Sequence, residues 1–424
     1  MGLSVAVPGA LRIALLLAMV ALAGCATTQP YDRIDDRLRA GDTAGALEAA
    51  DALDTARNRA LFHMNRGMLL RLDGQLEASV DAFEEAKGIL GALEPISISE
   101  SVAEWTLAET TGAYQASIHE RLLLHSLQML NFLELGRPED ARVEALQVDL
   151  GLRRVDPREG AAPHGGDAFA RYLSGIVFEA TGDRSDALIA YRRAAQRYQA
   201  LGETVPRDLE LSLVRMLDAL DQHDERDRWM ERFGMESWRE RPAGYGQLLV
   251  VVQSGQGPHL RERTVATQDP RSGQLYRVSL PAVQRRGDPV RSLALETGQG
   301  RNEGERVEYV AASLDRWLEA RMPLLTTRAI SRNVVRHQVA GEARDQNPAL
   351  GALVNILGFL FEQADTRVWR TLPESLWLVR VDLPPGEYAP EVLLSVAGGQ
   401  RRVSLTEPVI IRDGGLTVRS LYQP

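Results

Sequence analysis

The helical character of the N-terminal half is clearest in one stretch, Asp167 to Tyr198, which reads DAFARYLSGIVFEATGDRSDALIAYRRAAQRY. Apolar residues recur every three or four positions in two segments, and the residues TGD separate them. This pattern predicts two amphipathic helices joined by a tight turn. Because an amphipathic helix stabilises itself by burying its apolar stripe against neighbours, we expect the pair to belong to a larger helical layer.

The same stretch resembles a tetratricopeptide repeat position by position. Gly175 stands where the first helix needs a small residue for the close approach of its partner, and Gly182 lies in the turn. The other repeat-defining positions are an aromatic residue and a small-large-small face on the second helix: Phe178, Ala187, Tyr191 and Ala194. Such helix pairs stack on neighbouring repeats and form a concave surface that suits a peptide or protein partner.

Three other segments carry this pattern. Residues 60–90 match at Gly67, Gly74, Phe83 and Ala86, residues 122–148 at Phe132, Gly136 and Ala141, and residues 37–53 at Gly41 and Ala46. The turn glycines Gly41 and Gly74 are 33 residues apart, close to the repeat period of about 34. We therefore expect a TPR-like helical repeat domain over residues 31–240, with a plain helical bundle as the alternative.

The N-terminus has the features of a lipoprotein leader. Residues 13–23 form an apolar stretch that is too short to span a bilayer. The sequence Leu22-Ala23-Gly24-Cys25 that follows resembles a lipobox, in which the cysteine is acylated and becomes the new N-terminus. Residues 1–24 are thus predicted to be a signal peptide, Cys25 the lipidation site and residues 25–30 a lipidated tether. An apolar leader with a chance cysteine is the alternative.

Composition limits the possible partners. Cys25 is the single cysteine, so the mature chain has no disulfide and no cysteine-based metal site. The chain carries 49 basic and 58 acidic residues, a net charge of −9. Without Arg12 of the leader the mature chain has 48 against 58, a net charge of −10. No basic block stands out, which disfavours nucleic acid and anionic lipid as partners. We expect no cofactor and no metal.

Residues 245–424 are predicted to form a mixed α/β domain. Residues 247–255 and 275–283 indicate strands, whereas the polar stretch 298–304 indicates a loop. Residues 310–343 are predicted to be helical, with a break or kink at Pro323. Alternation from Ser375 to the C-terminus, with the turn DLPPGEY at 382–388, predicts a small immunoglobulin-like β-sandwich. The expected fold class is thus α+β, an α-helical TPR-like solenoid followed by a mixed domain with a β-rich end.

The apolar run Ala349 to Gln363 leaves two alternatives open. Its length favours a buried core helix over a membrane span, while a hairpin or helix that dips into the membrane beside the lipid anchor is the other possibility.

Two segments resemble a family of proteobacterial envelope lipoproteins. They are EQADTRVWRTLPESLWLVRVDLPPGEY, at Glu362 to Tyr388, and RAISRNVVRHQVAG, at 328–341. The similarity extends in order along the mature chain, behind the lipobox and the repeats. It implies a protein anchored in the outer membrane by its N-terminal lipid and facing the periplasm. It supplies no catalytic residues.

Motifs for catalysis are absent from the sequence, which contains no G-x-S-x-G, H-E-x-x-H, C-x-x-C or Walker loop. Glu362, Asp365 and Arg367 mix charges between an apolar run and a strand, and we interpret them as a structural ion-pair joint in preference to an acid/base pair. The leading functional hypothesis is a non-enzymatic adaptor that binds another envelope protein. The alternatives are a structural or assembly component of an envelope machine and a cell-wall hydrolase with an unrecognised site.

Overall fold

The computed structural model describes residues 29–92, 112–154, 166–268, 275–346, 364–405 and 408–424. The predicted lipidation site Cys25, the apolar run Ala349–Gln363 and Glu362 lie outside these residues. Among the described helices, none combines the length and the apolarity that a membrane span needs.

Helices fill the N-terminal half, mostly as consecutive pairs. Two short helices come first, α2 (Gln29–Arg39) and α3 (Thr43–Ala50), with a 3-10 turn at Asp51–Leu53. Four pairs follow: α4 (Arg59–Leu72) with α5 (Leu76–Ala92), α7 (Ile118–Glu134) with α8 (Pro138–Arg154), α9 (Asp167–Ala180) with α10 (Arg184–Ala200), and α11 (Arg207–Ala219) with α12 (His223–Phe233). The two helices of each pair contact one another, and the short turns make them antiparallel.

Local sequence explains the best-matched pair. Gly182 adopts a φ of +83° after α9, and the amide of Asp183 donates to the carbonyl of Phe178 at 2.8 Å, which ends the helix. A Cβ atom on Gly175 would lie 2.4 Å from the ring of Tyr191, so only glycine allows α9 and α10 to pack this closely.

The C-terminal half is built around one mixed sheet of seven strands in the order β11-β1-β6-β5-β4-β8-β9. Its members are β1 (Gly246–Ser254), β4 (Val290–Glu296), β5 (Arg301–Tyr309), β6 (Ser375–Leu383), β8 (Glu391–Val396), β9 (Gly399–Ser404) and β11 (Leu416–Gln423). β1 pairs with β11 in parallel, and the remaining neighbours are antiparallel. Two small antiparallel sheets complete the strands: the hairpin β2 (His259–Gln268) with β3 (Leu275–Gln284), and the pair β7 (Gly386–Tyr388) with β10 (Val409–Ile411), which are not consecutive in the chain.

The mixed α+β class is confirmed, whereas the separate immunoglobulin-like sandwich is not formed. Four of the C-terminal strands belong to the same sheet as β1, β4 and β5. The reason is that β6 buries both of its faces: Leu376 and Leu378 pack in the helical core, and Trp377 and Val379 pack in a second core on the other face. A solvated outer face, which a small sandwich would need, is therefore missing at this strand.

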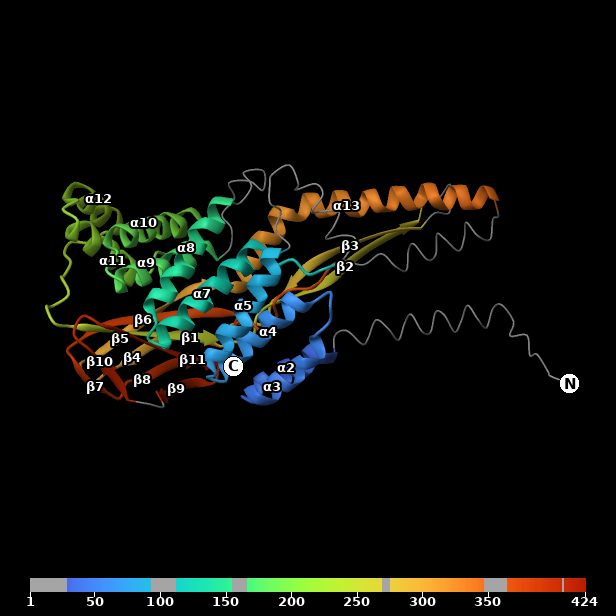
Figure 1. Ribbon diagram of the computed structural model, residues 1–424. Coiled ribbons are helices and arrows are strands. Elements are labelled where there is room, and N and C mark those ends of the chain that lie inside the picture. The colour runs from blue at the N-terminus through green and yellow to red at the C-terminus, as the bar shows by residue number, and fades with distance from the viewer. Residues whose placement is uncertain (1–28, 93–111, 155–165, 269–274, 347–363, 406–407) are drawn as a thin grey trace.

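The predicted loop at 298–304 is also wrong in part, because β5 begins at Arg301. The sequence of β5 lacks an alternation of apolar and polar residues. The strand is stabilised by backbone pairing with β4 and β6. The helix that follows, α13 (Val310–Gln346), continues through Pro323. Figure 1 shows α13 and the β2–β3 hairpin extending away from the helices and the sheet.

The helical layer covers one face of the sheet (Figure 1). α7 contacts β11 and α9 contacts β5. Leu249 and Val251 of β1 belong to the same apolar core as Leu127 and Leu173 of these helices. The inner face of the array is thus occupied by the sheet of the same chain, so the open concave surface expected from the sequence is not available along α7 and α9.

Candidate interaction site

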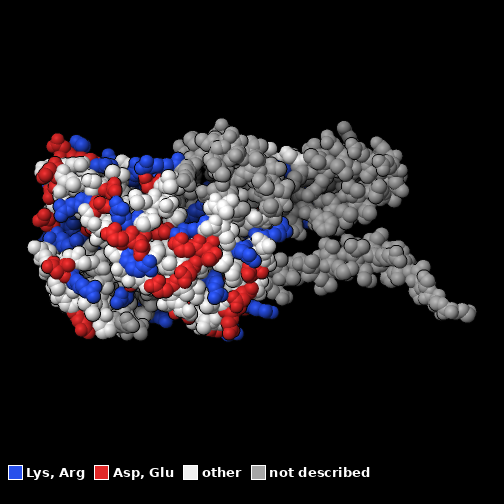
Figure 2. Space-filling view, viewed as in Figure 1, with Lys and Arg blue, Asp and Glu red and all other residues white. Residues whose placement is uncertain are grey.

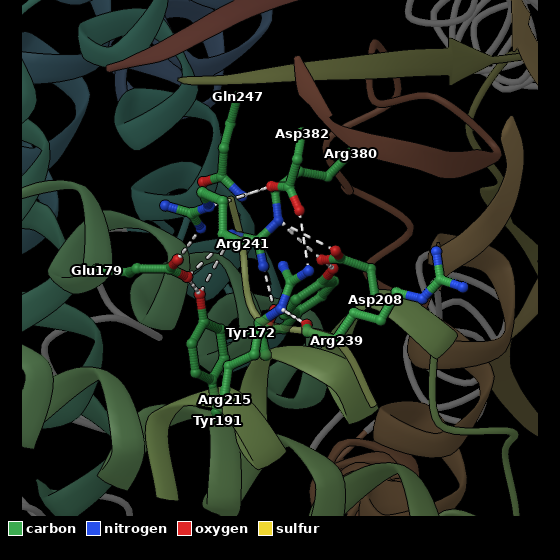
Figure 3. A network of polar contacts seen from close by, with 11 residues as sticks. Tyr172, Glu179, Tyr191, Asp208, Arg215, Arg239, Arg241, Gln247, Arg380 and Asp382 are labelled. Atoms are coloured by element: carbon green, nitrogen blue, oxygen red, sulfur yellow. Dashed lines mark hydrogen bonds and ion pairs between the residues drawn. The ribbon is translucent and has the colours of Figure 1, made fainter. Parts of the chain in front are cut away.

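A buried polar network joins the helices to the sheet and fixes which helical face points inward. We call it the helix–sheet joint; it contains Tyr172, Glu179, Tyr191, Asp208, Ser212, Arg215, Arg241, Gln247, Arg380 and Asp382. Figure 3 shows these side chains, which all carry labels there except Ser212, converging from α9, α10 and α11 on one side and from β1, β6 and the segment before β1 on the other.

Arg380 is the centre of the joint. It follows Leu376 and Leu378 on the helix-facing side of β6, and its side chain is 1% exposed. Its guanidinium donates to Glu179 Oε2 and to Asp208 Oδ2, both at 3.0 Å, and also to the hydroxyl of Ser212. A charge this deeply buried is tolerated only with such compensation.

Two further arginines complete the joint at Asp382. Arg215 donates to its carboxylate at 2.9 Å and Arg241 at 3.1 Å, while Gln247 donates at 2.9 Å. Arg241 also pairs with Glu179. Three arginines therefore face three carboxylates across the boundary between the two halves.

The electrostatics of the joint keep the carboxylates ionised. Burial raises the pKa of Glu179, but Arg380 and Arg241 outweigh it and lower that pKa to about 2. For Asp382, too, burial raises the pKa, and Arg215 and Arg241 bring it below its usual value. The hydroxyl of Tyr191 donates to Glu179 at 2.6 Å, and burial raises the pKa of this phenol well above its ordinary value. Groups whose pKa values lie this far from 7 keep one protonation state at neutral pH. They therefore suit a structural ion-pair network better than proton transfer.

The opposite, solvent-facing side of the array carries an unusual feature on α8. Val143, Leu146 and Leu150 are 51%, 43% and 40% exposed, and their spacing of three and four positions puts them on one face of the helix. The inward face of α8 is different, because Ala141, Ala145 and Val148 are buried. We call the three exposed residues the α8 stripe.

The apolar surface continues onto the next outer helix. Ile189 of α10 is also exposed, and it lies one turn before Arg193. Arg193 pairs with Asp149 of α8 at 2.7 Å, which places the two helices side by side at this point. Elsewhere the visible face of the protein has acidic and basic side chains interspersed (Figure 2).

The structure describes two of the three residues of the predicted ion-pair joint, Asp365 and Arg367. Asp365 and Arg367 pair at 2.6 Å, with the Asp365 side chain 60% and the Arg367 side chain 28% exposed. The same guanidinium donates to Asn58 Oδ1 at 3.2 Å and to the carbonyl of Gly112 at 2.8 Å. Arg367 thus connects the segment before β6 to the start of α4. Burial raises the pKa of Asp365, but the paired Arg367 lowers it below its usual value.

The repeat-defining residues lie inside the helical layer. Phe83, Ala86, Phe178, Ala187, Tyr191 and Ala194 are buried. Gly67 repeats the arrangement of Gly175, since a Cβ atom there would lie 2.5 Å from the ring of Phe83. Gly74 has a φ of +79° in the turn between α4 and α5. The helix residues build the layer and are buried from a partner, whereas the turn glycines Gly74 and Gly182 are exposed at its edge.

Sequence reasoning missed the helix–sheet joint and the α8 stripe. One signal for the joint was available: in SLWLVRVDL, Arg380 and Asp382 continue the alternation of Leu376 and Leu378, so charged residues occupy a face that is otherwise apolar. The stripe is not recognisable from sequence, because outer and inner apolar residues of α8 look alike until the neighbours of the helix are known.

No described group of three or more His, Cys, Asp or Glu residues could hold a metal ion. Buried His119 contacts the hydroxyl of Ser117 at 2.6 Å, and His125 contacts Glu144 at 2.7 Å. One polar cavity of about 150 Å³ lies between α4, α7, β1 and β11 and is lined by Arg71, Glu134 and Tyr422 among others. This volume suits a few water molecules.

Comparisons with known proteins give structural similarity alone. No family model matches the chain, and no curated protein matches it by sequence. Among solved structures, MamA is 14% identical, with 52% of this chain and 100% of that chain covered at a TM-score of 0.32. A kinesin light chain-like protein with TPR-like repeats from Podospora anserina is 13% identical, with 48% and 91% covered at 0.33.

A tetratricopeptide repeat protein from Parabacteroides merdae is 16% identical, with 50% of this chain and 80% of that chain covered at a TM-score of 0.21. These scores are low, and the fold described above follows from the contacts of this chain itself.

Proposed function

We propose that this protein is a lipid-anchored envelope adaptor that binds another envelope protein through the outer face of its helical layer. The α8 stripe is the observation that carries this proposal. A soluble helix normally turns its apolar residues inward, and clustered exposed apolar residues mark interaction surfaces. The inner face of α7 and α9 is covered by the sheet, which leaves the outer face for a partner.

The stripe suits one kind of partner, an amphipathic helix of another protein. A helix that presents apolar residues at positions i, i+3 and i+7 can pack its own apolar residues against such a ridge. The ion pair between Asp149 and Arg193 borders the apolar surface and offers charges of both signs at its rim. A polar rim around an apolar centre is the usual anatomy of a protein interface.

Replacing Val143 and Leu146 together with aspartate should strongly reduce partner capture. Both side chains are at least 43% exposed, so the unfolding midpoint should stay near that of the wild type. Capture of the partner from detergent-solubilised envelope should fall by about tenfold or more, because the centre of an interface carries most of the binding energy. The captured amount is measured by quantitative mass spectrometry.

Ile410→Asp is the matched control, since Ile410 is a 55% exposed apolar residue on β10. It should leave capture unchanged. Equal capture by the stripe variant and the wild type would contradict the proposal, and a large stoichiometric complex in place of one partner would favour an assembly component.

The lipid anchor has its own test. Cys25→Ser removes the thiol that would carry the diacylglycerol, so the protein should leave the membrane fraction after a wash with 0.5 M salt, whereas the wild type should stay. Three acyl chains give stable anchoring that salt does not screen. The measurement is an immunoblot of washed membranes. A Cys25→Ser protein that remains in the salt-washed membrane would show that another segment holds it there.

A further inference from the structure

One part of the fold projects from the rest and has its own charge. It consists of β2 (His259–Gln268), β3 (Leu275–Gln284) and the distal part of α13 (Arg321–Gln346), and we call it the arm. β3 contacts α13, and Figure 1 shows both running side by side away from the sheet. Leu260 and Val283 of the hairpin pack with Leu314 and Leu318 of α13, which fixes one hairpin face against the helix.

The arm is basic on an acidic protein. Its three segments contain eight arginines and three acidic residues, a net charge of +5. The remaining chain has 41 basic and 55 acidic residues, a net charge of −14. Sequence composition did not reveal this contrast, because the arginines come from separate segments that only the fold brings together.

The outer face of the hairpin combines positive charge with apolar surface. Arg261, Arg263 and Val265 alternate along β2 and are exposed, with Val265 at 66%. Their direct partners on β3 are Ala282, Leu280 and Val278, which share the same side of the hairpin. Arginine beside aliphatic side chains is the composition of surfaces that bind the interface of a lipid bilayer.

The base of the arm contacts α2, the first described helix after the proposed lipid anchor in the sequence. Gln256, just before β2, and Arg286, just after β3, both bind Asp35 of α2, at 2.6 Å and 2.7 Å. Asp35 is ten residues from Cys25.

We propose that the outer face of the hairpin, Arg261, Arg263 and Val265 with their β3 partners, binds the surface of a phospholipid bilayer that contains anionic headgroups. This goes beyond the adaptor function, because it assigns a second, electrostatic membrane contact that needs neither the acyl chains nor a protein partner. Through it the arm lies against the membrane and orients the helical layer. Charge complementarity selects anionic lipid over a neutral surface.

The absence of any cysteine besides Cys25 allows a site-specific test. The protein used is residues 25–424 with Cys25→Ser. A polarity-sensitive dye is attached to the thiol of Val265→Cys, on the proposed face, and in a second variant to the thiol of Ile410→Cys, at a control position. Vesicles of phosphatidylcholine with 30% phosphatidylglycerol should shift the emission at 265 to the blue and leave that at 410 unchanged. Pure phosphatidylcholine vesicles, or 0.5 M salt, should give no shift at either position.

Charge removal gives the second readout, flotation with the same vesicles. Arg261→Gln with Arg263→Gln should weaken binding roughly 25-fold, since each basic side chain near an anionic surface contributes about fivefold. Arg228→Gln with Arg239→Gln removes the same charge from exposed positions outside the arm and should leave binding unchanged. Absence of a dye shift with anionic vesicles, or equal losses in both double variants, would overturn the proposal. Neither result depends on acylation or on partner capture, so the adaptor function is tested separately.

Discussion

Replacing Arg380 with methionine is expected to lower the free energy of unfolding by about 3–5 kcal/mol, because removal of one partner leaves buried carboxylates without their compensating charge. Asp208 would keep only its hydrogen bond from Tyr172, and Glu179 would keep Arg241. Methionine fills much of the arginine volume, so the loss would come from charge and hydrogen bonding and only slightly from packing. Urea unfolding measures this loss.

Two probes should be recorded together, far-UV circular dichroism for the helices and the fluorescence of the six tryptophans, three of which, Trp317, Trp369 and Trp377, belong to the C-terminal half. Since the joint spans both halves, the two transitions of the variant should move together. Arg402→Met is the control: Arg402 pairs with Glu391 on the surface, and exposed pairs contribute little. A joint variant as stable as the control would contradict the role given to Arg380.

The same variant should change the dependence of stability on pH. The pKa of Glu179 is lowered to about 2 in the folded protein, so its ionisation stabilises the fold above the ordinary carboxyl pKa. That contribution is lost as the pH falls from about 4.5 toward 2. In Arg380→Met the folded pKa of Glu179 should rise, and the pH-dependent gain between these values should shrink.

Trp369→Ala should have an effect of similar size, about 3–5 kcal/mol, as for other large buried aromatic residues. Trp369 is 1% exposed and meets the ring of Phe83 edge-on at 5.8 Å. Its backbone amide donates to Glu120 Oε1 at 2.8 Å. Trp369, which belongs to the C-terminal half, thus fills space in the core between the first two helix pairs. Alanine at this position would leave a cavity there.

The variant Trp369→Phe separates the contribution of ring packing to stability from that of the indole hydrogen bond. It keeps the ring contact with Phe83 but removes the indole N–H that donates to Thr371 at 3.0 Å, so we expect a loss of about 1–2 kcal/mol. Thermal and urea unfolding of the three proteins give the comparison. Similar stability of Trp369→Ala and the wild type would mean that the segment before β6 is not part of the helical core.

The helix pairs could be predicted from sequence because their signals are local. Gly175, Gly182 and Tyr191 specify a close crossing and a turn within one stretch of chain, and the structure has α9 and α10 at those positions. The mixed α+β class was likewise evident, since strand alternation after Ser375 is a local pattern. The ion-pair role of Glu362 and the acylation of Cys25 stay predictions, because both residues lie outside the described part.

The parts that could not be predicted depend on contacts between distant segments. β6 alternates like the strand of a small sandwich, yet it pairs with β1 and β5 and buries both faces. Arg380 reaches Asp208, which lies 172 residues earlier. The outer position of Leu146 depends on which side of α8 the neighbouring helices cover. No periodicity within one segment contains this information.

The central claim is that a partner binds the outer face of the helical layer, at the α8 stripe, while the inner face is closed by the sheet of the same chain. Crosslinking in intact cells tests it most directly, with a photo-reactive amino acid at Leu146 and, separately, at Ile410. We expect one discrete crosslinked species from position 146 that disappears when Val143→Asp is added, and no such species from position 410. A crosslink pattern that is the same at both positions, or no product at position 146 in cells where the protein is captured with a partner, would contradict it.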